Sequence, residues 1–69
     1  MKKTAEEIKN IFLKEMTWKE INTIYNSTVT INRNEKPECV KMARKNILRV
    51  LNKYNIEKED WNKVYNSNI

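Results

Sequence analysis

Residues 37–54 read PECVKMARKNILRVLNKY, and they carry the clearest structural signal in the chain. Pro37 suits the first turn of a helix, where a backbone N–H would have no partner in any case. The apolar residues after it recur at three- and four-residue spacing, which is typical of one buried helix face: Val40, Ala43, Ile47, Val50, Leu51 and Tyr54. Asn55 takes the place that Gly usually fills after the last turn. The stretch therefore predicts a long amphipathic helix.

Further helices are expected on both sides of this one. The sequences TAEE at 4–7 and TWKE at 17–20 are capping boxes, in which a Thr hydroxyl accepts from the third helical N–H while the Glu reaches back. Three acidic residues within 57–60 suit the positive end of a last helix. We expect an all-α bundle of four helices at about 5–15, 18–26, 37–54 and 57–66. Apolar and polar residues alternate at 28–32, as in a short strand, but no partner strand is visible and an isolated strand is not stable. Residues 27–36 are therefore expected to form an irregular connection, with Val29 and Ile31 packed on the core.

A short internal similarity bears on how these helices are arranged. Residues 21–27 read INTIYNS, and residues 61–67 read WNKVYNS. Each segment falls in a short helix that follows a longer one, so the similarity predicts two similar helical hairpins within a single domain spanning 1–69. In that arrangement Tyr25 and Tyr65 would be buried at matching positions. A chance match in an Asn-rich chain is the alternative.

The composition excludes many classes of protein. The 69 residues leave room for one small domain and contain no His and no Gly. Without Gly there is no Gly-rich phosphate loop, and without His there is no His-based acid–base catalysis and little prospect of a zinc site. The serines have no base to activate them. We therefore expect no enzyme, no catalytic residue, no metal site and no cofactor.

The same composition bears on location and stability. Cys39 is the only cysteine, which fits a reducing cytoplasm, and we expect it to be a small, half-buried core-edge residue. No run approaches the ~18 apolar residues of a membrane span, so we expect a cytoplasmic protein without a membrane partner. The tryptophans, Trp18 and Trp61, are expected in the core or at its edge. Since so short a chain builds a marginal core, a homodimer mate or another partner could complete it.

Positive charge is concentrated in the expected third helix. Residues 36–54 hold six basic side chains and one acidic, so this segment carries +5, which equals the formal charge of the whole chain. Its basic residues at four-residue spacing predict one stripe opposite the apolar face: Lys41, Lys45, Arg49 and Lys53. Arg44 adds to the charge, and Asn46 flanks the stripe with an amide that can donate to phosphates or base edges. The pattern predicts a surface for an anionic partner; a merely solvated face is the alternative.

Two segments resemble a known DNA-binding motif. WKEI at 18–21 resembles the start of the first helix in helix-turn-helix regulators, and VKMARKNIL at 40–48 resembles their recognition helix. The resemblance implies that Lys41, Arg44, Lys45 and Arg49 face DNA. The sequence departs from the motif in its expected connection of about ten residues, where the motif uses three or four.

Two hypotheses follow for function. The first is a small nucleic-acid-binding protein of regulatory or mobile-element type, which grips phosphates with the third helix and favours DNA over RNA. The second is a helical interaction module, such as a phage-type inhibitor or adaptor, whose basic face docks on an acidic protein surface. Met42 lies among the basic residues and favours a contact surface of either kind.

Overall fold

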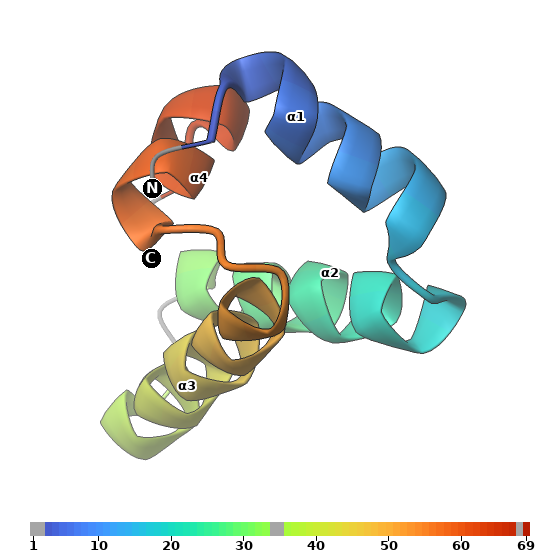
Figure 1. Cartoon of the computed structure of the whole chain (residues 1–69). Helices are drawn as coiled ribbons and strands as arrows, with labels where there is room; N and C mark the ends of the chain where they lie inside the picture. Colours follow the sequence, from blue (N-terminus) through green and yellow to red (C-terminus); the bar gives the residue numbers. More distant parts are fainter. Residues whose placement is uncertain (1–2, 34–35, 68) are drawn as a thin grey trace.

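The fold is a small all-α bundle, as the sequence predicts. The computed structural model describes residues 3–33, 36–67 and 69, and within these residues it contains helices and no strand (Figure 1). The elements are α1 (Ala5–Asn10), η1 (Ile11–Glu15), α2 (Trp18–Asn32), α3 (Pro37–Lys53) and α4 (Lys58–Tyr65). In the part of the chain described, no helix combines the length and the apolar character needed to cross a membrane.

The two predicted capping boxes are present. At the start of α1, the Thr4 hydroxyl accepts from the Glu7 N–H at 3.2 Å, and the Glu7 side chain accepts from the Thr4 N–H at 3.1 Å. α1 then continues into η1, a π-helical turn in which the Met16 N–H reaches the Ile11 carbonyl at 3.0 Å. The wider turn places Ile11 and Met16 in the core together, although they are five residues apart.

The irregular connection expected at 27–36 is wrong for most of its length. α2 continues to Asn32, so 27–32 are helical, and Asn34 and Glu35 lie outside the described residues. Two Thr hydroxyls bond back to the carbonyl one turn earlier, which satisfies their polar groups inside the helix: Thr28 to Ile24 at 2.8 Å and Thr30 to Asn26 at 3.0 Å. The alternating pattern resembled a strand, but packing of this face against the core overrides that local preference.

The end of α3 confirms the role predicted for Asn55. Its φ of 57° is the left-handed conformation that Asn tolerates better than most residues. The Ile56 N–H then bonds the Leu51 carbonyl at 2.9 Å, and the Asn55 N–H bonds the Asn52 carbonyl at 3.1 Å. These two bonds form a Schellman motif, which turns the chain sharply and delivers Ile56 into the core.

The helices pair differently from the predicted hairpins. α2 packs along α3, and α1 packs against α4, so the first and last helices are neighbours (Figure 1). The two matched tyrosines also differ, because Tyr25 is 67% exposed whereas Tyr65 is half-buried. The internal similarity is therefore not expressed as two equivalent hairpins.

One core joins all the elements. Its buried residues come from every helix and from the turns beside η1 and α4: Ile8, Ile11, Met16, Ile24, Ile47, Val50, Leu51, Ile56 and Trp61. Beside it, Phe12, Trp61 and Tyr65 form an aromatic cluster with ring centroids 4.5–5.7 Å apart. These tilted ring pairs fasten η1 to α4. The core position expected for Trp61 is confirmed, whereas Trp18 is 79% exposed and the expectation for it is wrong.

Candidate functional site

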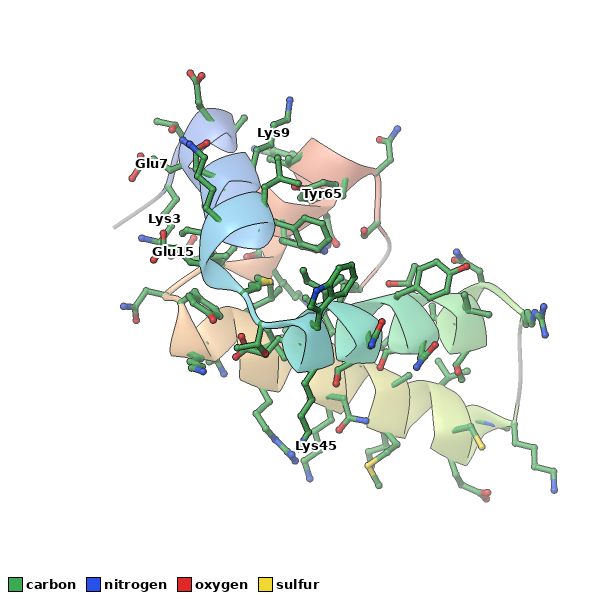
Figure 2. The ribbon with its side chains drawn as sticks, turned by 90° about the vertical axis from the view of Figure 1, so that its right-hand side faces the viewer. Lys3, Glu7, Lys9, Glu15, Lys45 and Tyr65 are labelled. Carbon is green, nitrogen blue, oxygen red and sulfur yellow. The ribbon has the colours of Figure 1, made fainter. Side chains whose placement is uncertain are left out.

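Four basic side chains are exposed on the outer side of α3, and we call them the cationic face: Lys41, Arg44, Lys45 and Arg49. α3 places Lys41, Lys45 and Arg49 there because its buried residues, Ala43, Ile47, Val50 and Leu51, occupy the opposite side, whereas Arg44 lies at the flank of the outer side, about 60° around the helix from Lys41. Each four-residue step turns about 40° around a helix, so the residues spread over the outer surface instead of lining one edge. Lys45 extends away from the body of the molecule (Figure 2).

No residue of the cationic face forms an ion pair within the part of the chain that the structure describes. Among the described residues, one ion pair is formed, between Lys53 and Glu20, and it does not involve the cationic face. Glu38 is the only acidic residue within 36–54. The four positive charges of the cationic face are therefore presented to solvent.

Lys53 has a different environment from the other basic residues of α3. Its Nζ donates to Glu20 Oε2 at 2.8 Å, and the Tyr54 hydroxyl donates to Glu20 Oε1 at 2.6 Å. The Thr17 N–H donates to the same Oε1 at 2.9 Å, as part of the second capping box. We call these four residues the Glu20 clasp, which ties the start of α2 to the end of α3. The sequence predicts Lys53 as part of the basic stripe. In the structure, however, its ammonium group is paired with the Glu20 carboxylate.

The hydrogen bonds of the clasp perturb the ionisation of its members. The donors, with Lys53 contributing most and Tyr54 next, lower the pKa of Glu20 from 4.5 to about 2. In return, the Glu20 carboxylate raises the pKa of Lys53 and of Tyr54, because it favours the protonated form of each. The ionised Glu20 is therefore the form on which this contact depends.

The clasp predicts a specific acid sensitivity. Since the pKa of Glu20 is about 2 in the folded chain and 4.5 as the ordinary value, its contribution is complete above about pH 4.5 and is lost as the pH falls toward about 2. Glu20→Gln should therefore lose less stability than the native chain over this range, measured as urea unfolding midpoints by circular dichroism. Glu7→Gln is the matched control, since Glu7 occupies the other capping box, where hydrogen bonds with Thr4 lower its pKa, and the charge of Lys3 lowers it further without forming an ion pair. Glu7→Gln should therefore reduce the acid sensitivity less than Glu20→Gln does. Equal acid sensitivity in Glu20→Gln and the native chain would contradict the prediction.

Asn46 and Met42 lie beside the cationic face, at the junction of the two paired helices. Asn46 is half-buried and lines the shallow grooves between α2 and α3, together with Ser27 on one side and Arg49 on the other. The Asn46 amide is therefore less accessible to a ligand than we expect from its place beside the basic stripe in the sequence. Met42 is 58% exposed at the rim of the same groove. Cys39, expected to be half-buried, is exposed there as well.

The paired helices are arranged side by side, unlike those of a helix-turn-helix motif. The Lys53–Glu20 pair joins the start of α2 to the end of α3, while Thr30 and Met42 line a groove where the end of α2 meets α3. These contacts describe an antiparallel pair along most of both helices, whereas the motif's helices cross at roughly 90–120°. The expected connection of about ten residues is wrong, because only residues 33–36 separate the end of α2 at Asn32 from Pro37. The connection therefore has the length that the motif uses, and the difference from the motif lies in how the two helices are arranged.

The structure reveals a second surface that the sequence reasoning missed. Trp18, Asn22, Tyr25 and Val29 recur at four- and three-residue spacing on α2, and we call them the neutral face. Trp18 and Tyr25 are 79% and 67% exposed, Asn22 is exposed and Val29 is partly exposed. The sequence does contain an indication of this surface, because residues 21–32 include no Asp, Glu, Lys or Arg although 33% of the chain is charged.

Comparisons with known proteins add nothing to this geometry. No protein-family description matches the sequence, and no curated protein and no solved structure shows significant similarity to it. The function of the chain is therefore inferred from its two exposed surfaces, the cationic face of α3 and the neutral face of α2.

Proposed function

We propose that this protein binds nucleic acid, chiefly through phosphates, with the cationic face of α3. The observation that carries the proposal is the exposure of Lys41, Arg44, Lys45 and Arg49 on one helix without a carboxylate in ion-pair distance among the described residues. Lys41 and Lys45, and Lys45 and Arg49, are each four residues apart, and like charges at this spacing repel by a few tenths of a kcal/mol per pair. An anionic ligand would relieve that repulsion, because the described residues form no ion pair with any of these side chains.

The dimensions of the face suit a duplex. Lys41 and Arg49 are eight residues apart, which is about 12 Å along a helix axis, so a polyphosphate backbone can contact several of these side chains at once. The major groove of B-form DNA is also about 12 Å wide and admits an α-helix, whereas that of A-form RNA is deep and narrow. The proposal therefore favours DNA over double-stranded RNA.

Salt dependence provides the direct test. Fluorescence anisotropy of a labelled random-sequence DNA duplex, and of an RNA duplex of equal length, should be titrated with the protein at several salt concentrations. If all four cations neutralise phosphates, log K should fall with log salt at a slope of about −3.6, from about −0.9 per contact. Absence of binding at low salt, or binding that is insensitive to salt, would contradict the proposal.

A second candidate function is favoured by Met42. This side chain is 58% exposed beside Lys41 and the rest of the cationic face, and flexible Met side chains are common at protein contact surfaces. The face would then dock on an acidic protein, as an inhibitor or adaptor does. Affinity capture with the purified protein, with and without nuclease, separates the candidates, because a partner held through nucleic acid is released by the nuclease and a direct protein partner is retained.

A further inference from the structure

We propose that the neutral face of α2 binds a second copy of this chain, and that α2 pairs antiparallel with its mate across a two-fold axis. The neutral face is defined by Trp18, Asn22, Tyr25 and Val29, which repeat at intervals of four, three and four residues. This spacing is the seam of a helix pair, in which alternate three- and four-residue steps keep one side facing a partner helix. The proposal is independent of nucleic-acid binding.

The seam is separate from the contacts that α2 makes within its own chain. Its buried contacts use Ile24 and Ser27, and different polar residues line the grooves against α3: Lys19, Glu20, Thr23, Asn26 and Thr30. None of the residues of the neutral face lines those grooves. One side of α2 therefore packs within its own chain, and the neutral face lies on another side, which is exposed to solvent.

Charge argues for a second copy as the occupant. Two copies each carry a formal charge of +5, so they repel each other least where they meet through an uncharged surface. The stretch 21–32 has no charged residue at all, whereas a strongly acidic partner would prefer the cationic face. Depletion of Lys and Glu together with exposed Trp and Tyr is also the composition typical of a protein interface core.

Shape and hydrogen bonding support an antiparallel arrangement. Centred between Asn22 and Tyr25, antiparallel pairing sets the large Trp18 against the small Val29 of the mate, whereas parallel pairing would set two indoles against each other. It also sets the Asn22 amide, which both donates and accepts, near a Tyr25 hydroxyl. Such an Asn within a seam commonly fixes register and oligomeric state.

The available area predicts a weak, reversible dimer. Aromatic side chains bury roughly 150–250 Å² each, so Trp18 and Tyr25 at their exposures of 79% and 67% supply roughly 300 Å². A stable interface needs about 800 Å² per partner, and the neighbouring neutral residues must provide the remainder. Dissociation on dilution is therefore expected.

Sedimentation equilibrium over a wide concentration range tests the proposal, with nuclease-treated protein in high salt so that nucleic acid cannot bridge copies. The mass should rise from 8.4 kDa toward twice that value as concentration increases. Trp18→Lys/Tyr25→Lys should weaken association by at least about 30-fold. Cys39→Lys/Met42→Lys is the matched control, because it also adds two cations, at exposed residues of α3 outside the neutral face, and should leave association unchanged.

A second variant keeps the test decisive if the first should fold poorly. Asn22→Val replaces the polar residue of the seam with an apolar one and should strengthen association, because the polar seam residue lowers dimer stability. Circular dichroism checks that each variant retains its helices. A chain that stays monomeric at every concentration would overturn the proposal, and so would Trp18→Lys/Tyr25→Lys associating as strongly as Cys39→Lys/Met42→Lys.

Discussion

Lys45→Glu/Arg49→Glu should bind the DNA duplex at least about 100-fold more weakly than the native chain at low salt. The double variant replaces two exposed cations with two carboxylates, so two phosphate contacts become repulsive. Both side chains are exposed and neither forms an ion pair within the described residues. The helical circular dichroism spectrum and the unfolding midpoint should therefore be preserved. Anisotropy titrations measure the loss.

Lys9→Glu/Lys14→Glu is the control for total charge. It changes the net charge equally but alters α1 and η1, where both lysines are exposed. Lys9 lies at the opposite end of the molecule from Lys45 (Figure 2). Equal losses in the two double variants would mean that total charge, and not the cationic face, determines binding.

Lys53→Gln separates the clasp from the cationic face. Replacing Lys45 with Gln should reduce the steepness of the salt slope by about 0.9, whereas Lys53→Gln should reduce it less and should lower stability, because the Lys53 ammonium already contacts Glu20 at 2.8 Å. Equal changes in slope for the two single variants would show that Lys53 leaves Glu20 to contact phosphate.

Ile47→Ala should cost about 2–5 kcal/mol of the free energy of unfolding, the usual result of removing a fully buried branched side chain. Ile47 is 0% exposed on the core side of α3. The whole domain is expected to have roughly 3–10 kcal/mol of stability at this length, so the variant should lose a large fraction of it and should unfold at a clearly lower temperature and urea concentration than the native chain. Thermal and urea unfolding followed by circular dichroism measure the change.

Met42→Ala provides the comparison on the same helix. Met42 is 58% exposed, and exposed substitutions usually change stability by no more than about 0.5 kcal/mol. If Ile47→Ala and Met42→Ala lowered the free energy of unfolding by similar amounts, the buried core would not be what determines stability.

Features that depend on local chemistry could be predicted from the sequence. Thr4 and Thr17 begin helices because their hydroxyls satisfy an N–H within the same turn. Pro37 begins α3, and Asn55 ends it in a left-handed conformation. Each of these signals involves residues only a few positions apart, so a single sequence contains all the information needed.

Features that depend on packing could not be predicted in the same way. α2 extends to Asn32 because Ile31 packs on a core assembled from distant helices, and the local alternation of residues gives no sign of it. The exposure of Trp18 follows from which side of α2 meets the core, and apolar character alone does not reveal that side.

The candidate site was predicted in part. The outward placement of Lys41, Lys45 and Arg49 follows from helical periodicity opposite the buried residues of α3. The pairing of Lys53 with Glu20 joins residues 33 positions apart, which periodicity within one helix cannot reveal. Of the basic residues in α3, Lys53 is therefore the one whose role changed once the fold was known.

The aromatic cluster has a consequence for biogenesis. Phe12 is far in sequence from the two rings that it contacts, Trp61 and Tyr65. Forming this contact therefore closes a loop of about fifty residues. α2 and α3 can pair as soon as both have left the ribosome, while the first helix must wait for α4, which is synthesised after them. Until then Ile8 and Phe12 are uncovered, and the nascent chain is most open to chaperones and proteases in that interval.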